Sequence, residues 1–211
     1  FACTVFGFAC TGDVITLTFK PRFYQRHKNI SYFRPWTYKV RQDSITGWSS
    51  WWAYMRNFRQ SDLNQLLSVW EDKRFADYGY RFIQIDDCFQ GGEHAAHRLL
   101  PNNGYPGGHP ETWLDWRKDL FPGGLTGYVA AVEGAGFEPG VWIGSHFGTL
   151  DIAERNPDWF VRGPDGKPFS GPWIGYAIDA SNRQAVDSLI RPTFRGLKNA
   201  DVGYVKIDIL R

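Results

Sequence analysis

Arg81 to Asp87 read RFIQIDD, a short apolar run that ends in two carboxylates. Such a run is typical of a buried β-strand, because β-branched and aromatic residues fill it and no turn residue interrupts it. Neighbouring side chains of a strand point to opposite faces. Asp86 and Asp87 could therefore turn toward one ligand only at the end of the strand, where the pleat is lost.

Strand and helix patterns alternate on both sides of this run. In chain order they are ITGWSSWWAY (45–54, strand), LNQLLSVWEDKRFADY (63–78, helix), RFIQID (81–86, strand), GLTGYVAAVEGAG (124–136, helix), PGVWIGSHF (139–147, strand), NRQAVDSLIRPTFRGLKNA (182–200, helix) and GYVKIDIL (203–210, strand). Ser61 or Asp62 is expected to cap the first helix, and Gly79 to end it. Pro192 is expected to kink the third helix.

This alternation predicts an α/β fold with parallel strands joined by helical crossovers. An open doubly wound sheet and a (β/α)8 barrel both satisfy it. No glycine-rich phosphate-binding motif follows any of the strands, which argues against a nucleotide-binding open sheet. Asp86, Asp87 and Asp208 instead follow strands at their carboxyl ends, the edge from which barrel enzymes build active sites.

The two acidic segments allow a functional and a structural interpretation. Asp86 and Asp87 could accept hydrogen bonds from adjacent sugar hydroxyls, or one could cap a loop while the other is solvated. Lys206 and Asp208 are two residues apart on a strand, so their side chains share a face. An ammonium group favours the ionised form of a neighbouring carboxylate, which could act as a nucleophile, but the pair could equally be a structural ion pair.

A long segment rich in glycine, proline and histidine, CFQGGEHAAHRLLPNNGYPGGHPETWLDWRKDLFPG (88–123), follows the aspartate pair. We interpret it as a loop that covers substrate. His94, His97, His109 and Asp115 fit no standard metal-site spacing, so no metal is expected there. Cys88 is expected to be a small packing residue rather than a redox thiol.

Composition excludes several classes of partner. The 24 basic and 22 acidic side chains form no long run of one sign, which argues against nucleic-acid and membrane surfaces. No apolar run approaches the roughly 20 residues of a membrane helix, so we expect a soluble protein, cytoplasmic or secreted. Aromatic residues make up 17% of the chain and suit either sugar binding or a tryptophan-rich core. Three cysteines are too few for a disulfide framework, although Cys3 could pair with Cys10.

The first part of the chain differs from the rest. VITLTF (14–19) alternates as a strand does, and ISYFRPWTYKV (30–40) is broken by Pro35. We interpret residues 1–40 as a β-type leader, the remnant of a preceding β-rich region, and residues 41–211 as the α/β domain. The chain begins at Phe1 without a signal-peptide pattern, which predicts a trimmed product or a fragment.

Three segments in this order, GWSSWWAY, IQIDDCF and YVKID, resemble the α-galactosidases of glycoside hydrolase family 36. The segment FPGGLTGYVAAVEGAGFEPGVWIG between them is also similar to that family, and the resemblance runs from Ile45 to Leu210. It implies a (β/α)8 barrel that hydrolyses terminal α-galactosides with retention of configuration. It also implies that no cofactor takes part.

The same resemblance assigns residue roles. Asp208 would be the nucleophile, and Lys206 would donate hydrogen bonds to sugar hydroxyls. Asp86 and Asp87 would accept hydrogen bonds from O4 and O6 of galactose. Trp142 and Trp48 would line the apolar side of the pocket.

The sequence departs from the family in one respect: it ends after the fourth strand, whereas the family places its acid/base on the sixth. The resemblance therefore implies a (βα)4 half barrel without its usual second carboxyl group. A non-catalytic galactoside-binding fragment, a galactosyltransferase and an α-N-acetylgalactosaminidase remain alternatives. A half barrel exposes two strand edges, which predicts a homo-oligomer, in which the partner's Asp86 and Asp87 could supply the acid. Within the chain, Glu93 and Asp115 are the next candidates.

Overall fold

The computed structural model describes residues 5–12, 14–20, 23, 26, 45–87, 89–91, 110–171 and 175–208. The chain divides into two compact units, residues 1–44 and residues 45–211. In the first unit, β1 (Val5–Thr11) and β2 (Val14–Lys20) pair as an antiparallel hairpin. The strand expected at residues 14–19 is confirmed, whereas the origin of residues 1–40 as a remnant stays a prediction.

A four-stranded parallel sheet organises the second unit. Its strands are β3 (Gly47–Ser49), β4 (Phe82–Ile85), β5 (Glu138–Ile143) and β9 (Tyr204–Ile207), and they lie in the sheet in chain order. Every neighbouring pair is parallel. The α/β class with a parallel sheet is therefore confirmed.

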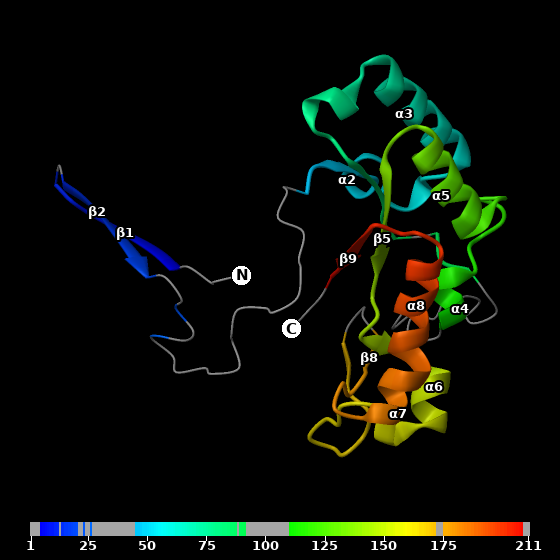
Figure 1. Cartoon of the computed structure of the whole chain (residues 1–211). Coiled ribbons are helices and arrows are strands. Elements are labelled where there is room, and N and C mark those ends of the chain that lie inside the picture. Colours follow the sequence, from blue (N-terminus) through cyan, green and yellow to red (C-terminus); the bar gives the residue numbers. More distant parts are fainter. Residues whose placement is uncertain are drawn as a thin grey trace. The chain divides into compact units, whose positions relative to one another are not determined.

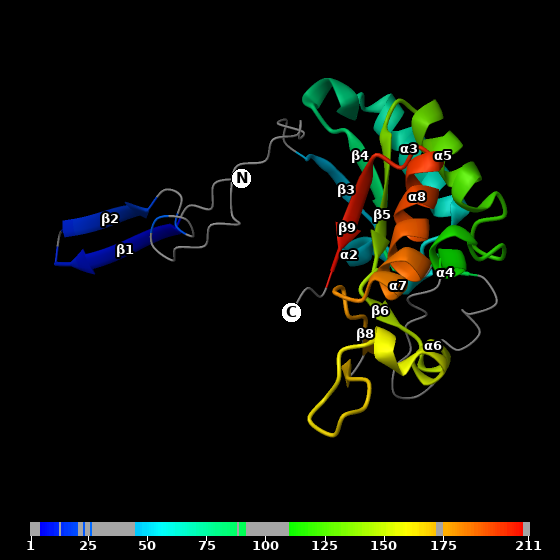
Figure 2. The same cartoon turned by 60° about the horizontal axis from the view of Figure 1, so that its bottom comes forward.

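The crossover helices cover one face of this sheet. They are α3 (Gln60–Asp72), α5 (Gly124–Gly134) and α8 (Arg191–Asn199), and Figure 2 shows all three on the same side of the strands. A doubly wound sheet carries helices on both faces. Strands in chain order with helices on one face are instead the arrangement of singly wound α/β folds, barrels included.

The first crossover helix begins earlier than its sequence indicates. Arg59 occupies the N-cap position of α3, and Asp62 lies in the first turn, where its carboxylate accepts a hydrogen bond from the Arg59 backbone N–H at 3.1 Å. The expected cap at Ser61 or Asp62 is therefore wrong by two or three positions. Of the four apolar residues at helical spacing, Leu63, Leu67 and Trp70 are buried and Leu66 is half-buried.

The third crossover helix changes its helix type just before Pro192. The segment runs as α7 (Arg183–Ala185), a π-helical turn (Val186–Ile190) and then α8, whose first turn contains Pro192. Proline has no N–H to donate and its ring crowds the preceding turn. The π-helical turn directly precedes the turn that contains Pro192, and the expected kink itself stays a prediction.

The part of the long loop that the structure describes is not an open loop. Pro110–Leu114 form the short helix α4, and Trp113, Trp116 and Phe121 are fully buried in the main hydrophobic cluster. The interpretation of 88–123 as a substrate cover therefore fails for residues 110–121. Residues 92–109, with Glu93 and the three loop histidines, lie outside the described residues, as does Cys88.

Between β5 and α7 in chain order, the protein forms a second, smaller layer that the sequence did not predict. It contains β6 (Phe147–Gly148), α6 (Leu150–Arg155), β7 (Ser170–Gly171) and β8 (Gly175–Ala177), with the strands in the antiparallel order β6-β8-β7. Figure 1 shows α6 and α7 beside one another near β8. This layer has its own hydrophobic cluster, formed by Ile152, Ala153, Phe160, Ile178, Ala185 and Leu189. Across the described residues, no helix is both long and apolar enough to cross a membrane.

Candidate functional site

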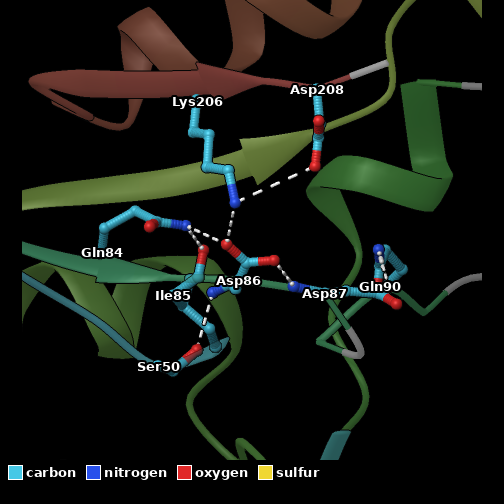
Figure 3. A network of polar contacts seen from close by, with 8 residues as sticks. All are labelled: Ser50, Gln84, Ile85, Asp86, Asp87, Gln90, Lys206 and Asp208. Atoms are coloured by element: carbon cyan, nitrogen blue, oxygen red, sulfur yellow. Dashed lines mark hydrogen bonds and ion pairs between the residues drawn. The ribbon is translucent and has the colours of Figure 1, made fainter. Parts of the chain in front are cut away.

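The carboxyl ends of β4 and β9 bring the charged residues of two distant segments together (Figure 3). The Lys206 ammonium lies 2.8 Å from Oδ2 of Asp86 and 4.0 Å from Oδ2 of Asp208. Lys206 and Asp208 share a face of β9 because they are two residues apart in an extended chain. The result is a row of alternating charge, Asp86, Lys206 and Asp208, that joins two strands which are not neighbours in the sheet.

Hydrogen bonds hold the Asp86 carboxylate in one orientation. Its Oδ2 accepts from Gln84 Nε2 at 3.1 Å as well as from Lys206, and its Oδ1 accepts from the backbone N–H of Asp87 at 3.0 Å. The backbone N–H of Asp86 donates to Ser50 Oγ at 2.8 Å. Asp86 is 2% exposed, so these donors replace the water that its charge would otherwise bind.

Asp87 is buried next to it, with 6% of its surface exposed. Its Oδ1 accepts a hydrogen bond from Gln90 Nε2 at 2.8 Å. β4 ends at Ile85, so both aspartates lie beyond the regular pleat. Both side chains line the same pocket, as expected for two neighbouring carboxylates at the end of a strand.

This pocket has a volume of about 240 Å³. The described residues that line it are Trp51, Trp52, Asp86, Asp87, Trp142, Lys206 and Asp208. The aspartate pair is buried, whereas the side chain of Asp208 is 50% exposed and that of Lys206 is 34% exposed. The pocket therefore combines a charged, buried wall with a carboxylate that is open to solvent.

Of the two tryptophans expected at this pocket, Trp142 lines it and Trp48 does not. Trp142 is 2% exposed, and its ring packs edge-on against Trp113, with the ring centroids 5.8 Å apart. The Trp48 ring packs against Tyr54 and Phe58, with its centroid 5.2 Å from that of Phe58. Trp48 lines a separate cavity of about 160 Å³ with Gln84 and Tyr204 among its other walls.

The family resemblance placed Trp48 at the pocket, and the segment 45–54, expected as one strand, divides into two elements in the structure. β3 ends at Ser49, and α2 (Trp51–Tyr54) follows it as a short helical turn. This turn carries Trp51 and Trp52 to the pocket. Helical spacing could not reveal it, because a four-residue helix is too short to show a period.

Ser50, Gln84 and Gln90 are further residues of the site that the sequence analysis did not single out. The proximity of Gln84 to Asp86 could have been predicted, since Gln84 lies two residues before Asp86 and therefore on the same face of β4. Asp115 is exposed at the end of α4 and does not line the pocket. Within the described ranges, no group of three or more histidine, cysteine or acidic side chains is placed to hold a metal ion.

The known proteins that this chain is similar to are α-galactosidases. No family model matches the chain. A "Probable alpha-galactosidase" of Dictyostelium discoideum is 27% identical over 130 residues, which are 62% of this chain and 29% of that protein.

Solved structures of α-galactosidases share the fold. The family 36 α-galactosidase AgaA of Geobacillus stearothermophilus superposes with a TM-score of 0.60 at 19% identity, over 80% of this chain and 21% of that one. The Thermus thermophilus α-galactosidase TtGalA, solved with p-nitrophenyl α-D-galactopyranoside, gives a TM-score of 0.59 at 20% identity, over 92% of this chain and 36% of its own. The chain thus spans about a fifth to a third of the length of these relatives. It resembles the α-galactosidases of glycoside hydrolase family 36, as its three motifs predicted, and it shares their fold.

Proposed function

We propose that the pocket binds the terminal galactose of α-galactosides and that Asp208 is the nucleophile of their retaining hydrolysis. The observation that carries the proposal is the row Asp86, Lys206 and Asp208 at the carboxyl ends of two strands, in a pocket that also contains Trp142. The TtGalA complex with an aryl α-galactoside supports galactoside as the ligand class.

Each residue has a role that its surroundings support. Asp86 and Asp87 are buried acceptors, suited to the O4 and O6 hydroxyls of galactose. Lys206 donates to Asp86 and has further ammonium hydrogens for a sugar hydroxyl. Trp142 presents an apolar wall to the C–H face of the ring.

Asp208 is placed for nucleophilic attack because its side chain is half exposed at the pocket. Its carboxylate would attack C1 of galactose while the bond from C1 to the leaving oxygen breaks. A general acid protonates that oxygen. Water then attacks C1 of the galactosyl ester and releases galactose with the original configuration.

The second carboxyl group is the open part of this mechanism. Retaining glycosidases place it about 5 Å from the nucleophile. We propose two sources, the Asp86 and Asp87 pair of a second copy, or Glu93 of this chain, because Asp115, the other candidate from the sequence, does not line the pocket. We further propose that β3, β4, β5 and β9 are half of a barrel wall. Among the described strands, β3 and β9 are the sheet edges, and unpaired edges favour association, so we also propose that the chain self-associates. Light scattering that shows a monomer at micromolar concentration would contradict self-association.

The first experiment tests binding by calorimetric titration with galactose and glucose. Galactose is expected to bind more tightly, because glucose turns its O4 hydroxyl away from the aspartate pair. Asp87→Asn should weaken galactose binding about ten-fold or more, since the buried carboxylate is replaced by a neutral amide that keeps only one acceptor oxygen. Equal affinities for the two sugars would contradict the proposal.

The second experiment tests the nucleophile with α-galactosyl fluoride, whose fluoride leaves with little help from an acid. Fluoride release and a mass increase of one galactosyl group on Asp208 are expected, and both should vanish in Asp208→Asn. Asp201→Asn is the matched control, because Asp201 is exposed in a turn at φ 59, where asparagine also fits. Galactose binding without labelling would favour the alternative, a non-catalytic galactoside-binding protein.

A further inference from the structure

We propose that Trp52 is the stacking platform for the second sugar of an α-galactoside, the unit attached to the galactose. This proposal rests on the proposed function, since it takes the galactose to lie against Asp86, Asp87 and Lys206. Trp52 lies in α2 and lines the same pocket as these residues. It would make the site selective for oligosaccharides over galactosides with a small substituent.

The exposure of Trp52 is unusual within this chain. Trp52 is 85% exposed, whereas every other tryptophan that the structure describes is buried or half-buried. No ring contact joins Trp52 to another aromatic residue in the described parts of the chain. Single exposed apolar residues are common and carry no meaning alone. Trp52, however, lies on the wall of a pocket that contains three carboxylates. The face of its indole is therefore available to a ligand held in that pocket.

The burial gradient of the pocket gives the direction of the ligand. Asp86 and Asp87 are 2% and 6% exposed and form the inner wall, whereas Asp208 is half exposed and Trp52 almost fully so. A galactose with O4 and O6 at the inner wall has C1 near Asp208. The substituent on C1 therefore leaves the pocket on its open side, where Trp52 lies.

The volume agrees with this division. Pockets that enclose drug-sized ligands have about 300–1,000 Å³, and this one has about 240 Å³. It suits one sugar ring, so a second ring must bind outside it. The C–H bonds of a pyranose carry partial positive charge and stack on the electron-rich face of an indole.

The test is calorimetric titration of the full chain with methyl α-galactoside and with melibiose, the galactosyl-α-1,6-glucose disaccharide. In the wild type, melibiose is expected to bind about ten-fold more tightly, the effect of about one good aromatic stacking contact. Trp52→Ala should reduce this ratio to about one. Trp52→Phe should restore part of it, because a smaller aromatic face remains.

Tyr78→Ala is the matched control. Tyr78 is 78% exposed and does not line the pocket, so this variant should keep the wild-type ratio. Equal melting temperatures would exclude a folding defect in Trp52→Ala. An unchanged ratio in Trp52→Ala, or a wild-type ratio of one, would overturn the platform and leave the galactose site intact. Absence of binding for both sugars would overturn the platform and the proposed function together.

Discussion

At the scale of single residues, the orientation of the site depends on groups that never need to touch a sugar. Ser50 is fully buried and accepts the backbone N–H of Asp86 at 2.8 Å. Ser50→Ala would leave this buried N–H without its acceptor. We expect the free energy of unfolding to fall by about 1–3 kcal/mol, and galactose affinity to fall with it.

Urea unfolding of Ser50→Ala, beside Ser68→Ala, measures the effect. Ser68 is exposed on α3, where alanine is a better helix former, so this control should change stability by less than about 0.5 kcal/mol. A loss in Ser50→Ala no larger than in Ser68→Ala would mean that the hydrogen bond to Asp86 contributes nothing to stability.

Contacts within one strand of the site could be predicted from the sequence, whereas contacts between distant segments could not. The two-residue spacing of Lys206 and Asp208 fixes a shared face of a strand, so their proximity followed from the sequence. The contact of Lys206 with Asp86 depends on the sheet order, which places β4 and β9 on either side of β5. Ser50 reaches Asp86 across 36 residues of sequence, and no local pattern carries such a contact.

At the scale of elements, long periodic segments were predictable and short ones were not. α3 and α5 bury one face over three or more turns, which leaves a clear period in the sequence. α2, α4 and the strands β6 to β8 are two to five residues long. Tertiary contacts decide their conformation, because so few residues cannot hold a helix or strand by themselves.

The approach of α8 to α4 depends on one glycine. A Cβ atom on Gly196 would lie 2.4 Å from Cδ1 of Leu114, closer than two non-bonded carbon atoms can come, so the Leu114 side chain would have to move out of its packed position. Gly196→Ala is therefore expected to destabilise the protein by about 1–3 kcal/mol, the usual range for overpacking. Gly127→Ala in α5 is the matched control. A Cβ there meets nothing within 4 Å, so the higher helix propensity of alanine should raise stability by about 0.5–1 kcal/mol. Thermal unfolding of both variants should show melting temperatures that move in opposite directions, and a rise in both would refute the close contact.

The Tyr128 hydroxyl ties α5 to two strands. It donates its single hydrogen toward the carbonyl oxygens of Ile83 at 2.6 Å and Gly140 at 2.8 Å. Burial raises the pKa of Tyr128 above its usual value of 10.0. The stability from the protonated hydroxyl is therefore fully present below about pH 10, and it is lost as pH rises from there toward the higher pKa of the folded state.

Tyr128→Phe tests both statements. At neutral pH we expect a loss of about 1–2 kcal/mol, because two buried carbonyls lose their donor. Above about pH 10, wild-type stability should fall more steeply than that of the variant, by up to about 1.4 kcal/mol per pH unit. Urea unfolding at a series of pH values provides the measurement. Parallel pH curves would show that Tyr128 ionises in the folded state as readily as in the unfolded one.

At the scale of the whole molecule, the second unit has two hydrophobic clusters of unequal size. The larger contains the buried residues of α3, β4, α5 and β5, and the smaller has six buried residues around α6, β8 and the π-helical turn. Burial of apolar surface is the main source of folding free energy, and regions with fewer buried contacts open first. The layer that contains β6, β7 and β8 should therefore open locally while the parallel sheet stays closed.

A hydrogen-exchange experiment with two leucine variants tests whether the smaller layer opens independently of the parallel sheet. Leu63 belongs to the larger cluster and Leu189 to the smaller, and both are buried, at 0% and 4% exposure. Each change to alanine should cost its own cluster about 2–5 kcal/mol. Leu63→Ala is expected to speed exchange of the β4 and β5 amides, which open only with the sheet. Leu189→Ala should speed exchange of the Ala177 and Ile178 amides, which donate to the Phe169 and His146 carbonyls, and leave β4 and β5 unchanged. If Leu189→Ala instead accelerated the β4 amides by the same factor, the two clusters would unfold as one unit, and the smaller layer would help to hold the sheet that carries Asp86 and Lys206.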